Sequence, residues 1–88
     1  MIEMTIDVPL PFPEQVALER IAHAILGPHG GHGWRVALIP FLTIPGCMLE
    51  IAMGREYVER RVLDAASAPE LERALRQVVR RRVTATAV

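Results

Sequence analysis

The chain is poor in cysteine and in aromatic residues, and it lacks two common polar residue types. It has one cysteine, Cys47, no lysine or asparagine, and only four aromatic side chains. A single cysteine excludes an internal disulfide and fits a reducing compartment. No leader-like segment opens the chain, and its longest apolar run is far shorter than a bilayer requires. The sequence therefore predicts a cytoplasmic protein without a membrane partner.

An excess of charge of either sign is also lacking. Ten arginines balance ten carboxylates, and the isoelectric point is near 6.8. This balance does not indicate a protein that binds nucleic acid or membrane surfaces. The distribution is uneven, because residues 1–54 carry two arginines against five carboxylates and residues 55–88 carry eight against five. Such a polarised chain is suited to attract its own copies or an oppositely charged partner, unless folding brings the two parts together.

Aliphatic residues are what the chain has in quantity. Hydrophobic residues occupy 51% of its 88 positions, which is enough for a globular core built from Ile, Leu, Val, Met and Ala. The length predicts a single domain over residues 1–88. A domain of this size buries only about 60% of its unfolded surface, so contact with a partner or with further copies is an expected source of stability.

The first third of the chain predicts a strand followed by a helix. Residues 2–8 alternate between apolar and polar side chains, as a half-buried strand does. Pro13 suits the first turn of a helix, and Gly27 is a natural end for it. The expected apolar stripe of this helix is Leu18, Ile21 and Ile25, with Val16 and Leu26 on its otherwise polar side.

A β-hairpin is predicted next. Residues 34–42 are almost continuously apolar, which is typical of a strand that needs cover on both faces. Pro40 cannot donate a ladder hydrogen bond, which favours an edge or a bulge there. Residues 43–46 predict a turn with Gly46 at a central position of type II, and residues 47–53 predict the return strand.

The last third contains one ambiguous segment and one clear helix. Residues 55–66 suit either a helix or a third strand of a meander. Ser67 and Glu70 have the spacing of a capping box, which predicts a helix start. Residues 83–88 alternate and are β-branched, so they predict a last edge strand or a frayed tail. The helix between them has a regular apolar stripe at Leu71, Ala74, Leu75, Val78 and Val79.

These elements together predict an α+β fold. Their order suggests a ferredoxin-like or related split β-α-β sandwich, with an antiparallel sheet and two helices on one face. This assignment is a fold-level pattern that many unrelated activities share, so it does not indicate a function.

The loop 27–33 is rich in glycine and histidine and has two interpretations. His29 and His32, with His23 on the preceding helix, form a candidate zinc or copper site, and Cys47 is a possible fourth ligand. The spacing matches no closed zinc pattern, and no carboxylate nearby is placed to orient an imidazole. The simpler interpretation is therefore a glycine-rich connector without a cofactor.

Two further groups of charged residues are candidate sites. In the helix 70–82, Arg73, Arg76 and Arg80 form a row that suits phosphate binding, although charge rows are usually solvated faces and the chain lacks a high isoelectric point. Glu3, Asp7 and Glu50 are able to share a sheet face, but exposed strands carry acids routinely. The sequence thus predicts no catalytic residue and no cofactor-binding motif.

The strongest functional indication is the surplus of apolar residues in the strand 34–42. A patch left uncovered by the two helices would mark an interface. The sequence therefore predicts a small, non-catalytic interaction or assembly module that acts as a homo-oligomer or an accessory subunit. Metal binding and weak nucleic-acid binding are the alternatives. The residues predicted to form the interface are Trp34, Val36, Leu38 and Phe41.

Overall fold

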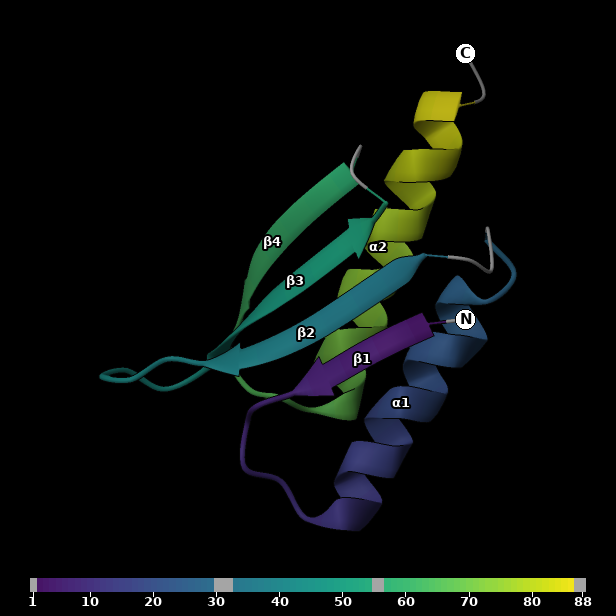
Figure 1. The fold of residues 1–88 in the computed structure, drawn as a ribbon. Coiled ribbons are helices and arrows are strands. Elements are labelled where there is room, and N and C mark those ends of the chain that lie inside the picture. Colours follow the sequence, from purple (N-terminus) through teal and green to yellow (C-terminus); the bar gives the residue numbers. More distant parts are fainter. Residues whose placement is uncertain (1, 30–32, 55–56, 87–88) are drawn as a thin grey trace.

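The computed structural model describes residues 2–29, 33–54 and 57–86, and it contains four strands and two helices (Figure 1). The elements in chain order are β1 (Ile2–Ile6), α1 (Phe12–Leu26), β2 (Trp34–Pro40), β3 (Cys47–Met53), β4 (Tyr57–Leu63) and α2 (Ala68–Thr86).

The four strands form one mixed sheet in the order β1-β2-β3-β4. β1 lies parallel to β2, with α1 as the crossover between them, and β2, β3 and β4 form an antiparallel meander. Both helices lie on the same side of the sheet, where they pack against each other (Figure 1). The α+β prediction is therefore confirmed, and the sheet is mixed rather than antiparallel. The ferredoxin-like arrangement is not confirmed, since three consecutive strands precede the second helix.

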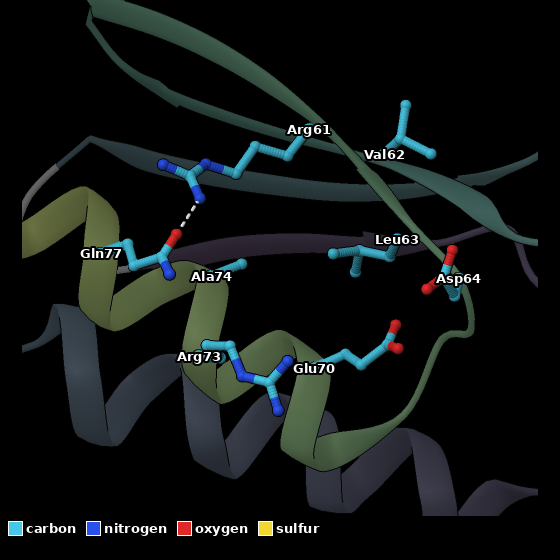
Figure 2. Close-up of a pocket in the computed structure, with 8 residues that line it drawn as sticks. All are labelled: Arg61, Val62, Leu63, Asp64, Glu70, Arg73, Ala74 and Gln77. Atoms are coloured by element: carbon cyan, nitrogen blue, oxygen red, sulfur yellow. Dashed lines mark hydrogen bonds between the residues drawn. The ribbon is translucent and has the colours of Figure 1, made fainter.

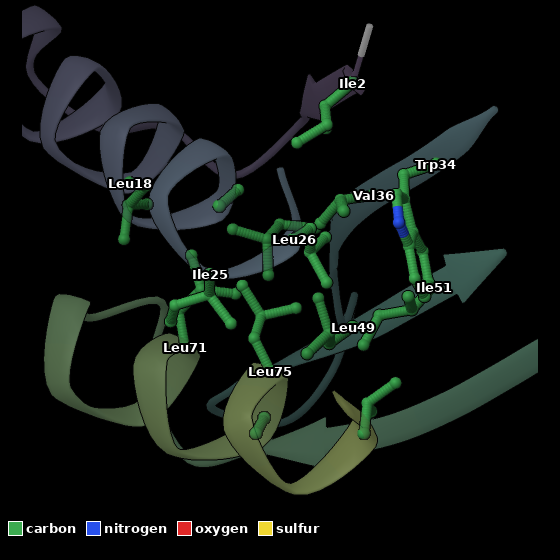
Figure 3. Close-up of a cluster of buried hydrophobic side chains, with 14 of the residues drawn as sticks. Ile2, Leu18, Ile25, Leu26, Trp34, Val36, Leu49, Ile51, Leu71 and Leu75 are labelled. Carbon is green, nitrogen blue, oxygen red and sulfur yellow. The ribbon is translucent and has the colours of Figure 1, made fainter. Parts of the chain in front are cut away.

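The core lies between the helices and one face of the sheet (Figure 3). Strand alternation directs one set of side chains toward the helices. The single tryptophan, Trp34, is buried there, and its indole Nε1 donates a 3.0 Å hydrogen bond to the carbonyl of His29. The largest fully buried side chains are Leu18 and Leu26 from α1, Trp34, Val36, Leu38, Cys47, Leu49 and Ile51 from the sheet, and Leu71, Leu75 and Val78 from α2.

The ambiguous segment is a strand. β4 pairs with β3 over its whole length, from Cys47 opposite Leu63 to Met53 opposite Tyr57. The tail prediction for residues 83–88 is wrong as far as the structure describes it, because α2 continues through Thr86. No Gly or Pro follows Pro69. Without a turn signal, the backbone there satisfies its hydrogen bonds within the helix instead of returning to a sheet edge.

Three local expectations need correction. Leu26 is fully buried rather than on the polar side of α1, because the end of α1 packs against both α2 and the sheet. Pro40 does not lie on an edge strand, because β2 is a central strand of the sheet. It is the last residue of β2, so the hydrogen bond that it cannot donate destabilises the sheet little. The carboxylate of Glu70 accepts a 2.9 Å hydrogen bond from the amide of Ala65 instead of closing a capping box on Ser67.

The β2–β3 connection depends on Gly46. Its φ is +101°, and a Cβ added there would lie 2.6 Å from the carbonyl oxygen of Leu63. Gly46 therefore has the positive φ that the predicted turn requires, and the end of β4 lies close to it.

The position of the core is tested by truncating one of its leucines. Leu75→Ala is expected to lower the free energy of unfolding by about 2 to 5 kcal/mol, because the side chain is 0% exposed and its loss leaves a cavity. Leu42→Ala removes the same atoms from a side chain that is 96% exposed and should change it by less than about 0.5 kcal/mol. Urea denaturation of dilute samples measures both. Similar losses in the two variants would contradict this core.

The turn is tested by a glycine pair. Gly46→Ala should destabilise the chain by more than about 2 kcal/mol, because an alanine there meets both an unfavourable φ and a backbone oxygen. Gly54→Ala is the control, since its φ of +58° carries strain of about 1 to 2 kcal/mol but no atom lies within 4 Å. A smaller loss at Gly46 than at Gly54 would show that the close approach to Leu63 is absent.

Candidate interaction surface

The sheet face that points away from the helices has no covering layer among the described elements (Figure 1). We call this surface the outer face. Its members on each strand alternate with the core residues. They are Glu3 and Thr5 on β1, Arg35, Ala37 and Ile39 on β2, Met48, Glu50 and Ala52 on β3, and Val58, Arg60 and Val62 on β4.

In β4 the apolar and charged side chains are reversed relative to an ordinary strand with one buried face. Val58 and Val62 lie on the outer face and are 52% and 72% exposed. Glu59 and Arg61 point toward α2. Inward charges are one way in which an edge strand avoids pairing with another sheet. Edge protection accounts for the inward Glu59 and Arg61, but it does not account for two outward valines.

The inward charges of β4 form a network with α2. Glu59 Oε1 accepts hydrogen bonds from Arg61 Nε at 2.8 Å and from Arg81 Nη1 at 3.0 Å. Arg61 Nη1 also donates to Gln77 Oε1, beside a hollow that Glu70 and Arg73 help to line (Figure 2). Within the described part of the chain, Arg61 Nη2 is buried without a hydrogen-bond partner. The network thus fills the gap beneath β4 with polar contacts instead of apolar core.

Apolar exposure continues from the outer face into the tip of the β2–β3 hairpin. Ile39 is exposed, and it pairs across the strands with Met48, which in turn pairs with Val62. Leu42, at 96% exposed, and Ile44 follow in the hairpin tip, which extends beyond the sheet (Figure 1). Single exposed apolar residues are common, whereas a connected group on one side of a small domain is a candidate contact surface.

The outer face also carries charged groups and a shallow hollow. Arg60 Nε donates to Glu50 Oε2 at 2.8 Å, and both side chains are exposed enough for this pair to contribute only about 0 to 1 kcal/mol. Arg35 Nη2 donates to the carbonyl of Gly54 at 3.2 Å. The small side chains of Ala37 and Ala52 leave a hollow of about 160 Å³ between these groups.

The structure places the four predicted interface residues mostly in the core. Trp34, Val36 and Leu38 are buried against the helices, so they are not on the surface of the monomer, and Phe41 is half-buried. The strand 34–42 was expected to need cover on both faces, and its outward residues are Arg35, Ala37 and Ile39. The apolar surface that sequence reasoning missed is on β4, because the period-2 pattern of residues 57–63 is readable only once the segment is known to be a strand.

The predicted metal site is only partly described. His23 and His29 are both exposed, His29 in the segment that follows α1, and His32 lies outside the described residues. Among the residues that the structure describes, no three His, Cys, Asp or Glu side chains are grouped to hold a metal ion. Cys47 is in the core, so it does not supply a fourth ligand at this surface. Zinc or copper binding at His23, His29 and His32 stays a prediction.

The predicted phosphate-binding row lies on the exposed part of α2. Arg73, Arg76 and Arg80 are exposed, and Arg76 Nη2 donates to Glu72 Oε1 at 3.0 Å, one helical turn away. Such spacing stabilises a helix by only a few tenths of a kcal/mol. Arg73 borders the β4 side of the helix, whereas Arg76 and Arg80 border the α1 side next to His29. Nucleic-acid binding by this row also stays a prediction.

The acidic residues of the sheet are spread over its width. Glu3 is exposed on β1 and Asp7 just beyond its end, and Glu50 lies two strands away in its contact with Arg60. Glu3 and Glu50 line the same hollow, with Arg35 between their strands. These residues are therefore placed as surface charges of the outer face.

The one thiol is held in the core. Cys47 is buried, and burial raises its pKa, with a further upward contribution from the negative charge of Glu70. A raised pKa reduces the fraction of reactive thiolate at any given pH. This environment matches the prediction that Cys47 packs as a small apolar residue.

Comparisons with known proteins identify no relative of this chain. Neither a family model, nor a curated protein, nor a solved structure matches it. Over the described residues, no helix is long and apolar enough to cross a membrane.

Cys47 provides a test of this packing. In mildly alkaline buffer, iodoacetamide is expected to alkylate the folded chain at least about tenfold more slowly than the urea-unfolded chain, because burial both shields the sulfur and raises its pKa. Mass spectrometry of quenched samples gives the two rates. The control is Leu42→Cys, which adds an exposed thiol and should react rapidly in folded protein. Comparable rates at Cys47 in the folded and unfolded states would contradict its burial.

Proposed function

We propose that this protein is a non-catalytic interaction or assembly module that associates through its outer face, as a homo-oligomer or as an accessory subunit. The observation that carries the proposal is the reversed patterning of β4, which turns Val58 and Val62 outward and Glu59 and Arg61 inward. A strand that served only to complete a monomer would gain more by burying its valines.

The continuity of the outer apolar residues supports this reading. Ile39, Met48 and Val62 occupy one row across three adjacent strands. The ordinary alternative is a monomer in which these side chains are scattered surface residues. That alternative accounts for one or two of them, but it offers no reason for their alignment or for the exposed hairpin tip that follows.

The chemistry of the surface also fits association better than catalysis. The hollow beside Ala37 and Ala52 is shallow, and the charged groups of Glu3 and Arg35 at its border are exposed. A contact surface with an apolar centre and a charged rim resembles the usual anatomy of a protein interface.

The proposal is tested by placing a charge on the outer face. Val62→Glu should weaken association at least tenfold, because the interface would bury a carboxylate without a partner. Sedimentation velocity over a wide concentration range measures self-association, and capture of proteins from a lysate of the native cell measures other partners. The stability of the dilute chain should change by less than about 0.5 kcal/mol, since Val62 is exposed.

Phe12→Glu is the matched control. Phe12 is 75% exposed, close to the value for Val62, but it lies at the start of α1 in the helical layer. Association should be unchanged in this variant. If the wild-type chain stays monomeric and captures nothing that Val62→Glu fails to capture, the proposed function is wrong.

A further inference from the structure

We infer that the occupant of the outer face is a second copy of this chain, packed face to face about a two-fold axis that runs along the strands between β2 and β3. This inference rests on the proposed function and adds the identity and orientation of the partner. It is carried by the placement of charges at the two edges of the sheet, by the small residues near its centre, and by the exposed hairpin tip.

The two edges of the outer face carry opposite charge. β1 presents Glu3 and, just beyond the strand, the exposed Asp7. β4 presents Arg60, which shares a row with Glu50, Ala37 and Thr5. Since β1 and β4 are at opposite ends of the strand order, one edge of the face carries carboxylates and the other carries the single guanidinium of Arg60, between Val58 and Val62.

A two-fold axis along the strands places unlike edges together. Rotation about it puts β4 of one copy over β1 of the other. Each row of residues paired across the four strands then faces the same row of the second copy. Arg60 of one copy then lies over Thr5 of the second copy, with Glu3 on one side and Asp7, just beyond the strand, on the other. In the same arrangement Val58 lies over Glu3 of the second copy. A guanidinium has five N–H donors, so Arg60 is able to keep its contact with Glu50 and also meet these carboxylates.

The other in-plane axis, across the strands, is disfavoured by charge. It would place β1 over β1 and β4 over β4, so that Arg60 would lie near Arg60 of the second copy and the acidic edges would face each other. Like charges brought together in an interface oppose association. The charge pattern therefore selects the axis along the strands.

The middle of the face suits the same orientation. Ile39 of one copy lies over Met48 of the other, and the symmetry repeats this apolar contact. Ala37 and Ala52 are small enough to let the sheets approach closely near the axis. Arg35 of one copy lies one row from Glu50 of the second copy, so the central charges are also of opposite sign.

The hairpin tip provides an independent indication. The axis passes between β2 and β3, and residues 41–46 join these strands at one end of the sheet (Figure 1). The two tips of the dimer would therefore lie side by side, so that Leu42 and Ile44 could cover their counterparts. An axis across the strands would place the tips at opposite ends and leave these residues exposed.

The area of the face sets the expected strength. The sheet has three strands of seven residues and one of five, which gives a surface of at most about 23 Å by 19 Å, or roughly 440 Å² per copy. Stable interfaces bury about 800 Å² per partner. The sheet alone thus predicts a weak dimer that dissociates on dilution, and the contacts of the hairpin tips add to it.

The orientation is tested by a charge exchange between two variants. Arg60→Glu places a carboxylate over the acidic edge of an identical copy, and the double variant Glu3→Arg, Asp7→Arg places arginines over Arg60. Each variant alone should self-associate at least tenfold more weakly than wild type. When they are mixed, both edge contacts join unlike charges, so a one-to-one pair should form. Native mass spectrometry distinguishes the pair by mass, and thermal melting checks that each variant is folded.

Restored pairing in the mixture supports the inferred orientation. Self-association of both variants at wild-type strength would overturn it. A mixture that stays monomeric would also overturn it, provided that the wild-type chain dimerises and Val62→Glu does not. In the latter case the proposed function stands. If Arg60→Glu is unfolded because position 60 faces Glu50, Arg60→Gln replaces it and should still weaken the wild-type dimer. A wild-type chain that is monomeric, while its outer face captures a different protein, overturns the inference and leaves the proposed function intact.

A second experiment reads the axis directly. In Leu42→Cys, a short bis-maleimide should link two copies, because the tips lie side by side about the axis. Phe12→Cys is the control and should give no linked dimer, since Phe12 lies in the helical layer. Cys47 is buried, so it adds no background in the folded chain. Failure of Leu42→Cys to cross-link, at concentrations where wild type is dimeric, would overturn the orientation.

Discussion

Two helices of this 88-residue chain cover one face of a four-stranded sheet, and the described elements include no third layer for the other face. The presence of a single helical layer, which covers one face of the sheet, decides where the other side chains lie. The largest apolar side chains, including Trp34, are directed to the single covered face. The outer face carries a mixture of small, charged and aliphatic residues. Exposed aliphatic residues of this kind either form an interface or promote aggregation.

β4 shows the effect of this single layer on one strand. Its inner side overlies α2 at the border of the core, where Glu59, Arg61 and Arg81 make a charged network. Charges there disfavour growth of the sheet by edge pairing, so the association proposed above uses the outer face. The inward charges of β4 therefore act at the edge of the sheet, whereas its exposed Val58 and Val62 belong to the outer face.

Most elements of the fold followed from local patterns. The alternation of residues 2–8, the glycine turn at Gly46 and the apolar stripe of α2 each depend on contacts within a few residues, so they were readable without a structure. Residues 55–66 were not, because their residue types suit both a helix and a strand, and the unpaired edge of β3 decided between them. The topology was missed for the same reason: the strand at β4 replaces the last strand that a ferredoxin-like order requires.

The sequence predicted an exposed apolar surface, but it did not predict which residues form that surface. Composition and periodicity alone determined that this chain has more apolar side chains than two helices cover, because that follows from counting residues against faces. Tertiary structure alone decided which of them remain outside. Trp34, Val36 and Leu38 were expected at the interface and are buried, since the direction of every side chain on a strand is set by register with its neighbours. Register is a relation between distant segments, and no local pattern contains it.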